Sequence, residues 1–272
     1  AVARLALRGR PLSRPNPAVG ALVVREGRVV GRGWTQPTGR PHAEAMALEQ
    51  AGGLPPDATV FVTLEPCAHD SARGPACAEL LAAARPARVV IGVGDPDPRT
   101  AGAGLARLRD AGIAAEVIDC PASSGSLAGY LIQRRSGRPH VTLKLALSLD
   151  GGIATALGES RWITGQAARA HVHSRRALEG GGGEAVMWVG GVPGRAHRFS
   201  LDVRLPGLEP RSPERMVLTR GPVKGAGALP SPQAIHGLAG VQYLYLEGGG
   251  SAAAAFLTHD LVDRLELYRA PI

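Results

Sequence analysis

The sequence predicts an α/β protein built from two domains. Its length of 272 residues exceeds that of a usual single domain. Hydrophobic residues make up 44% and charged residues 20%, close to the average of folded proteins, so extensive disorder is not expected. Short β-branched runs alternate with stretches rich in Ala, Leu and Glu, which is typical of a largely parallel sheet covered by helices. Residues 123–139 form a polar, glycine-bearing segment, so we place the boundary near Arg138 and expect domains at 1–138 and 139–272.

The elements of both domains follow from this alternation. Arg25–Arg28 has the character of a turn, so the first two strands are expected to form an antiparallel hairpin at the sheet edge. The four glycines Gly180–Gly183 imply a flexible loop in the second domain. We expect strands at 18–24, 59–64, 88–93, 140–147, 185–190, 215–219, 241–248 and 261–268, and helices at 42–53, 77–84, 102–112 and from Gln166.

Composition also limits the classes of protein to which the chain can belong. The longest uncharged apolar runs fall well short of the roughly 20 residues that a membrane-spanning helix needs. The arginine-bearing N-terminal segment lacks an apolar core followed by a cleavage site, so no signal peptide is expected. We therefore expect a cytoplasmic protein with reduced thiols. The net charge of +8 fits an anionic ligand such as a phosphate or a nucleic acid, and it fits solubility alone equally well.

Four residues in the first domain have the pattern of a catalytic zinc site. His42 and Glu44 stand at the start of an Ala/Leu helix, where both side chains can reach a site ahead of the helix end. Cys67 follows a strand, and Cys77 opens the next helix. Zinc prefers thiolate and imidazole ligands, and a catalytic zinc keeps three of them. His42, Cys67 and Cys77 supply that number, which leaves Glu44 free to move protons, as in the zinc-dependent nucleobase deaminases.

The spacing of the two cysteines leaves alternatives open. Nine residues separate Cys67 from Cys77, whereas the usual gap in these deaminases is two, so the intervening residues have to form a loop. A disulfide between them, or two unrelated core cysteines, are the other interpretations. His69 and Asp70 lie in this loop and are more consistent with substrate contacts or surface residues than with ligands. Cys120 has no partner motif and is interpreted as structural.

Several motifs of the first domain together resemble one family. The stretches "RPNPAVGALVV", "PHAEAMALEQAG", "TVFVTLEPCAH", "GPAC" and "GDPDPRTAGAGLARLRDAGI" are similar to the bifunctional deaminase/reductase of riboflavin biosynthesis, which also has a long loop between its cysteines. The resemblance implies a cytidine-deaminase-like three-layer αβα domain. It also implies zinc-dependent hydrolytic deamination of 2,5-diamino-6-(5-phosphoribosylamino)pyrimidin-4-one. Asn16 would contact the base of this substrate, although an asparagine between two prolines also suits a plain turn.

The second domain is similar to the reductase domain of the same family through "GRPHVTLKLALSLDGGIAT", "GESRWITG", "ARAHVHSRRA" and "YLYLEGGGSAAAAFL". The resemblance implies a dihydrofolate-reductase-like α/β fold, incomplete at its C-terminus, that reduces the ribosyl group with NADPH. Backbone amides at a strand–glycine–helix junction can hold a pyrophosphate, although such a glycine run is also found in ordinary loops. The residues implied are Ala146, Trp162, Gly249, Gly250, Ser251 and Ala252 for the cofactor, Ser160, Arg176, Leu201, Arg204 and Glu247 for the substrate, and Lys144 and Asp150 near the reacting centre.

Two positions of the second domain depart from the family pattern. Pro193 stands where a threonine is expected at the nicotinamide end, and His197 stands where an aspartate is expected. A proline offers neither a hydroxyl nor an amide hydrogen, so that contact with the cofactor is lost. Whether the reductase domain is active is therefore left open, and a non-catalytic second domain is one alternative. A tRNA adenosine deaminase is the other, but it gives the second domain no role, so a nucleic-acid partner is not expected. The family resemblance also implies a homo-oligomer.

Overall fold

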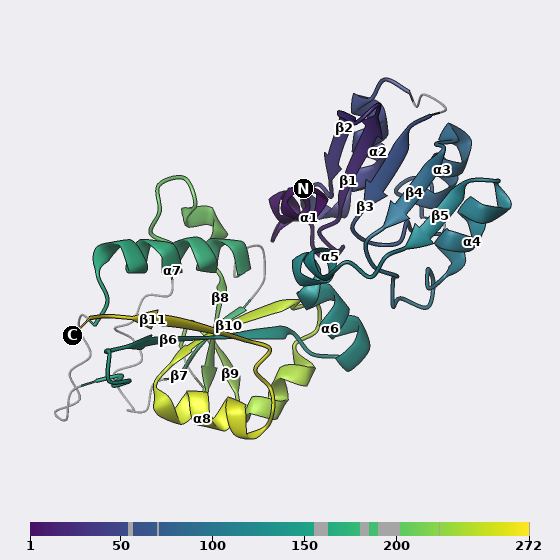
Figure 1. Ribbon diagram of the computed structural model, residues 1–272. Coiled ribbons are helices and arrows are strands. Elements are labelled where there is room, and N and C mark those ends of the chain that lie inside the picture. Colours follow the sequence, from purple (N-terminus) through teal and green to yellow (C-terminus); the bar gives the residue numbers. More distant parts are fainter. Residues whose placement is uncertain are drawn as a thin grey trace. The chain divides into compact units, whose positions relative to one another are not determined.

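The computed structural model describes residues 1–53, 57–69, 71–154, 163–179, 185–189, 202–222 and 224–271. The chain divides into two compact units, Ala1–Arg135 and Ser136–Ile272, whereas the sequence pattern places the boundary after Arg138. Both units are α/β (Figure 1). Within the described ranges, no helix is long and apolar enough to cross a membrane.

The first unit contains a five-stranded mixed sheet in the order β2-β1-β3-β4-β5. β1 pairs antiparallel with β2 and with β3, and β3, β4 and β5 are parallel, so the expected edge hairpin is confirmed. The elements of this unit are α1 (Val2–Ala6), η1 (Leu7–Gly9), β1 (Gly20–Arg25), β2 (Arg28–Trp34), η2 (Pro37–Gly39), α2 (Ala43–Gln50), β3 (Thr59–Val62), α3 (Cys77–Ala84), β4 (Arg88–Ile91), α4 (Ala103–Asp110), β5 (Ala114–Val117), α5 (Pro121–Ser126) and α6 (Ala128–Ser136).

Helices cover both faces of this sheet. Gly33 of β2 lies against α2, whereas Gly20 of β1 lies against α1. Gly33 is paired with Ala21, the neighbour of Gly20, and successive residues of a strand point to opposite faces. α2 and α1 therefore pack on opposite faces, with α3 beside α2 and α5 beside α1. The predicted three-layer αβα arrangement is confirmed.

The second unit contains a six-stranded sheet in the order β11-β6-β10-β7-β8-β9, in which each strand runs parallel to its neighbours. β9, η4 and η5 were not predicted from the sequence. The elements are β6 (His140–Leu147), α7 (Gln166–Glu179), β7 (Ala185–Val189), η4 (Glu209–Arg211), β8 (Glu214–Leu218), β9 (Gly227–Leu229), η5 (Pro232–Gly237), β10 (Tyr243–Gly248), α8 (Gly250–Thr258) and β11 (Arg264–Arg269).

The two faces of the second sheet differ in chemistry. On β10, Leu244 and Leu246 pack with Phe256 of α8 in an apolar core. Tyr245, which points the other way, packs with Val172 of α7. Figure 1 shows α7 and α8 on opposite sides of this sheet. The α7 side is the polar face, and it is the side that carries the predicted reductase residues of β6 and β10.

Candidate active sites

Close packing of α2 on β2 fixes the position of the first turn of α2, and the first of two candidate sites lies at this helix end. A Cβ at Gly33 would lie 1.9 Å from the carbonyl oxygen of Ala43, so only a glycine lets the helix approach so closely. His42 is the N-cap residue of α2, and Glu44 lies in its first turn. Both side chains therefore lie at the positive end of the helix, as the sequence predicts.

Three side chains converge at this helix end. Nδ1 of His42 lies 3.2 Å from Sγ of Cys77 and 3.6 Å from Sγ of Cys67. The candidate ligand atoms of the three residues all lie within 4.8 Å of one another. The two cysteines are free thiols, so the disulfide alternative is not supported. Cys77 is the first residue of α3, which returns the second cysteine to the site after the loop.

The electrostatics of the cysteines suit a zinc ion. Hydrogen bonds from the Cys77 thiol and the His42 ring lower the pKa of Cys67 to about 4, although burial opposes this change. The Cys67 sulfur and burial raise the pKa of Cys77. One thiol of the pair therefore readily becomes the thiolate that zinc requires, and a bound cation favours loss of the second proton too. An imidazole and two thiols in this arrangement fit a three-ligand zinc site.

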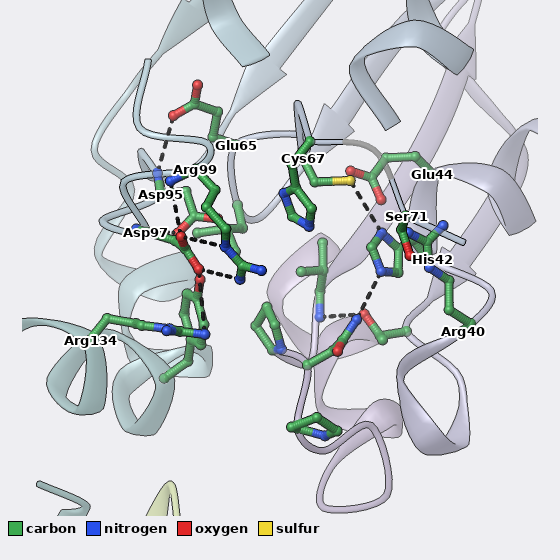
Figure 2. Close-up of a pocket in the computed structure, with 18 of the residues that line it drawn as sticks. Arg40, His42, Glu44, Glu65, Cys67, Ser71, Asp95, Asp97, Arg99 and Arg134 are labelled. Carbon is green, nitrogen blue, oxygen red and sulfur yellow. Dashed lines mark hydrogen bonds and ion pairs between the residues drawn. The ribbon is translucent and has the colours of Figure 1, made fainter. Parts of the chain in front are cut away.

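Glu44 lies beside the three candidate ligands and is 3% exposed. Burial raises the pKa of its carboxyl group above the ordinary value, and the nearby His42 only partly offsets the effect. Figure 2 shows the Glu44 carboxyl group next to the Cys67 sulfur. A buried carboxyl group that is adjacent to a metal site, without being needed as a ligand, is suited to transferring protons.

Asn16 contacts the first site through His42. Its side-chain amide lies 3.0 Å from Nε2 of His42, and Nδ2 donates to the carbonyl of Gly39 at 3.2 Å. Gly39 has φ of +86°, and a Cβ there would lie 2.5 Å from Cγ of Asn16. Because Nδ1 faces the cysteines, the contact at Nε2 orients the imidazole for metal binding. Asn16 also lines the pocket, so its contact with a substrate base stays a prediction.

A pocket of about 230 Å³ opens in front of these residues. His69, from the loop between the cysteines, lines it, and its Nδ1 lies 3.5 Å from Oγ1 of Thr100. Sequence reasoning missed much of the pocket lining. The "DPDPR" turn carries a cluster of charged residues, which was the available signal. The missed lining residues are Arg40, Glu65, Ser71, Arg73, Asp95, Asp97, Arg99, Tyr130 and Arg134.

The second unit brings three of the predicted reductase residues together on its polar face. Lys144 of β6 and Glu247 of β10 are register partners, and their side chains form an ion pair at 3.4 Å. Nε of Arg176, from α7, donates to the other oxygen of Glu247. Burial tends to raise the pKa of Glu247, but the ion pairs with Arg176 and Lys144 outweigh burial and lower it. Ala146 lies two residues beyond Lys144, on the same face.

His173 of α7 is a neighbour of this cluster that sequence reasoning missed. Its Nδ1 lies 3.5 Å from Nη1 of Arg176 and accepts a hydrogen bond from the backbone amide of Arg204 at 3.3 Å. The Arg204 residue itself is exposed. Asp150 lies in the exposed turn after β6, where the Ser148 hydroxyl donates to its carboxylate.

The predicted cofactor glycines lie where β10 leads into α8. Gly249 is the N-cap residue of α8 and makes no side-chain hydrogen bond to the helix, and Gly250, Ser251 and Ala252 form the first turn. An N-cap without a side chain leaves the first amides of a helix open to an anion, which fits a pyrophosphate. The other residues predicted from the resemblance, Ser160, Trp162, Leu201, Pro193, His197 and Gly180–Gly183, lie outside the described residues, as does Asp70.

Fold and site together define a class of protein. A three-layer αβα unit with a His/Cys/Cys cluster beside a glutamate is that of a zinc-dependent nucleobase deaminase. Residues 1–93 match the family model "Cytidine and deoxycytidylate deaminase zinc-binding region", and residues 139–223 match the "RibD C-terminal domain". The chain belongs to the family of the riboflavin biosynthesis protein RibD.

Individual relatives support this assignment. The chain is 37% identical over 276 residues to RibD of Mycobacterium tuberculosis, an alignment that covers 95% of this chain and 79% of that protein. It is 47% identical over 175 residues to RibD of Escherichia coli, which covers 64% of this chain and 47% of the relative. The structure of Acinetobacter baumannii RibD aligns with a TM-score of 0.84 and 34% identity, over 100% of this chain and 85% of that chain.

The match of residues 139–223 decides against a tRNA adenosine deaminase. A reductase-type domain of the RibD family has no place in a tRNA adenosine deaminase. The chain is an enzyme of riboflavin biosynthesis with a zinc-binding deaminase domain and an NADPH-dependent type of reductase domain.

Proposed function

We propose that the first unit removes an amino group hydrolytically from 2,5-diamino-6-(5-phosphoribosylamino)pyrimidin-4-one. The observation that carries this proposal is the buried Glu44 beside His42, Cys67 and Cys77 at the end of a pocket. A solved relative from Thermotoga maritima, 31% identical, is described as a diaminohydroxyphosphoribosylaminopyrimidine deaminase/5-amino-6-(5-phosphoribosylamino)uracil reductase. Its name supplies the substrate class.

The protein's own groups would act as follows. His42, Cys67 and Cys77 hold zinc, which when bound makes water a nucleophile at neutral pH. Glu44 accepts a proton from the attacking water and passes it to the departing amino group, which leaves as ammonia. Burial favours this role because it raises the pKa of Glu44 above its ordinary value, which makes the carboxylate a stronger base toward the proton of the attacking water.

The second unit would reduce the ribosyl group of the deaminated product with NADPH. Its cofactor contacts would come from Ala146 and from the amides of Gly249, Gly250, Ser251 and Ala252. Arg176, Arg204 and Glu247 would contact the substrate. Lys144 is a candidate for the reacting centre, since it lies on the same face as Ala146 and is held by Glu247. Asp150 is the weaker candidate, because its contacts are with its own turn.

Two broader features belong to the same proposal. We place the enzyme in the cytoplasm, since a site made of two free thiols needs a reducing compartment. We also propose a homo-oligomer, as the family resemblance implies. Sedimentation velocity of the purified chain tests the second statement, and a single species at the monomer mass would contradict it.

One assay tests both catalytic statements. The purified chain, loaded with zinc, is given the diaminopyrimidine phosphate with and without NADPH, and ammonia release and NADPH oxidation are followed separately. We expect ammonia in both reactions and NADPH oxidation only after deamination. No ammonia from a zinc-loaded chain would refute the deaminase. Ammonia without NADPH oxidation would identify the second unit as non-catalytic.

A further inference from the structure

A pair of arginines lies at the end of the deaminase pocket away from the metal ligands. Asp97 is the centre of this group. Its carboxylate accepts Nε and Nη2 of Arg99 at 3.0 and 2.6 Å, and Nη2 of Arg134, from α6, lies 3.4 Å away. Figure 2 shows Asp97, Arg99 and Arg134 together on one side of the pocket, and His42, Glu44 and Cys67 on the other.

The carboxylate is buried, whereas the two cations are not. The Asp97 side chain is 5% exposed, but the side chains of Arg99 and Arg134 are 59% and 40% exposed. A guanidinium carries five N–H donors, and the bidentate contact with Asp97 uses only one edge of Arg99. The remaining donors of both arginines are available to the pocket that they line. The two guanidinium groups outnumber the one carboxylate that they share.

Each arginine has a fixed position. The hydrogen bonds from Arg99 lower the pKa of Asp97 far below its ordinary value, so the carboxylate stays ionised and holds both cations. The Arg134 guanidinium also lies over the ring of Tyr130, 5.5 Å from its centroid, and the Tyr130 hydroxyl donates to Asp95 at 2.8 Å. A cation that is already oriented loses little entropy when it binds an anion.

Glu65 connects the segment that carries Asp97 and Arg99 to the metal end of the pocket. This buried carboxylate accepts backbone amides from Asp95, Gly102 and Leu105, at 3.2, 3.1 and 3.0 Å. Glu65 is separated from the ligand Cys67 by a single residue. The segment that carries Arg99 is therefore fixed relative to the metal ligands. A ligand that spans the pocket meets a nucleophile at one end and fixed cations at the other.

We propose that Arg99 and Arg134, held by Asp97, bind the phosphate monoester of the substrate and so position its pyrimidine at the metal end. This proposal rests on the proposed deaminase function. Guanidinium forks match the geometry of phosphate oxygens. The other two arginines of the pocket each donate to a backbone carbonyl instead: Arg40 to Pro75 at 3.3 Å and Arg73 to Thr38 at 2.7 Å. These two bonds join the cysteine loop to its neighbouring segment.

The test compares two substrates that differ only in the phosphate. The wild-type chain and the variants Arg99→Gln, Arg134→Gln and Arg73→Gln, all loaded with zinc, are assayed for ammonia release from the phosphoribosylamino substrate and from its dephosphorylated form. Each of the first two variants leaves Asp97 one guanidinium, and melting temperature and zinc content check the fold. Arg107→Gln is the matched control, since Arg107 lies on α4 outside the pocket and pairs with the exposed Glu79.

We expect KM for the phosphorylated substrate to rise roughly 10- to 100-fold in Arg99→Gln and Arg134→Gln, with kcat within about twofold. KM for the dephosphorylated substrate should not change, and Arg107→Gln should match wild type. Lysine at either position should restore part of the loss, because it keeps the charge but not the fork. Equal losses on both substrates, or discrimination lost only in Arg73→Gln, would overturn the proposal.

A second measurement does not depend on turnover. Inorganic phosphate is titrated into the zinc-loaded proteins by calorimetry, and its inhibition of deamination is measured in parallel. We expect competitive binding to wild type that weakens about tenfold or more in the two variants. Unchanged phosphate affinity would overturn the subsite even if no variant or wild type released ammonia, so failure of the subsite is distinguishable from failure of the deaminase itself.

Discussion

The metal end of the first unit and the ion-pair cluster of the second unit both bury a glutamate, but they treat it in opposite ways. Glu44 is 3% exposed, and burial raises its pKa. Glu247 is 7% exposed, and its ion pairs with Arg176 and Lys144 outweigh burial and lower its pKa. The Glu44 carboxyl group therefore binds a proton more readily than an ordinary glutamate, whereas the Glu247 carboxyl group stays ionised.

This difference separates a chemical role from an organising role. A carboxylate with a raised pKa is a stronger base than an ordinary one, which suits proton transfer. A buried anion with two cationic partners positions those partners, and its removal leaves them uncompensated. We therefore expect substitutions of Glu44 to affect turnover and substitutions of Glu247 to affect stability.

The largest effect is expected from Glu44→Gln. Loss of the proton-transfer group should lower kcat for ammonia release by about 10²- to 10⁴-fold. Zinc content, measured by atomic absorption, should stay at the wild-type level, because the three candidate ligands are other residues. The exposed Glu49, on the same helix, provides the control Glu49→Gln. Full turnover in Glu44→Gln would remove the distinction drawn between the two glutamates.

Glu247→Gln should destabilise the second unit by about 3 kcal/mol, since Arg176 then lies buried without its anion. Hydrogen exchange followed by mass spectrometry should show faster exchange in peptides from β6 and β10, and unchanged exchange in β1 and β3. The exposed Glu214 gives the control Glu214→Gln, which should exchange like wild type. Normal protection of β10 in Glu247→Gln would show that the ion pairs do not organise this sheet.

Gly33→Ala tests whether the packing of α2 on β2 places the metal ligand His42. A Cβ 1.9 Å from the Ala43 carbonyl forces α2 away from β2, at a cost of about 1–3 kcal/mol. Because His42 caps α2, zinc affinity should fall together with stability, which a competition titration with a chelator measures. Gly125→Ala is the control, since no atom lies within 4 Å of a Cβ built there. Wild-type zinc affinity in Gly33→Ala would contradict the link between helix packing and ligand placement.

The smallest effect is expected from acidification. The pKa of Glu247 in the folded chain lies below its ordinary value of 4.5, so its stabilising contribution is complete above about pH 4.5. That contribution is lost as the pH falls through the lower, folded value. Exchange protection of β10 should therefore fall between pH 5 and pH 3 more steeply in wild type than in Glu247→Gln. Identical slopes would mean that Glu247 is not the group responsible.

The metal end could be predicted from sequence because its chemistry is local. His42 and Glu44 are two residues apart at a helix start, Cys77 opens the next helix, and Cys67 lies five residues after the end of β3. Residue type and position along the chain were therefore enough to identify the cluster. The βαβ rhythm likewise predicted both units, since each strand and helix is a short run with its own hydrophobic pattern.

The rest of the site depends on pairings between distant residues. Arg134 meets Asp97 only because α6 folds back against the turn after β4, and an arginine on a helix has no signal that distinguishes it from a solvent-exposed one. His173 similarly contacts Arg204, which lies 31 residues later in the sequence. The short strand β9 was missed because three residues of Gly, Ala and Leu carry no β-branched pattern.

The loop between the two cysteines is closed at its base. The amide of Cys77 donates to Sγ of Cys67 at 3.3 Å, and the amide of Ala78 donates to the Cys67 carbonyl at 3.1 Å. These two hydrogen bonds fix both ends of the loop relative to each other. Substitutions at exposed loop positions such as Arg73, which lines the pocket, can therefore change which molecule the pocket accepts while the two sulfurs keep their positions.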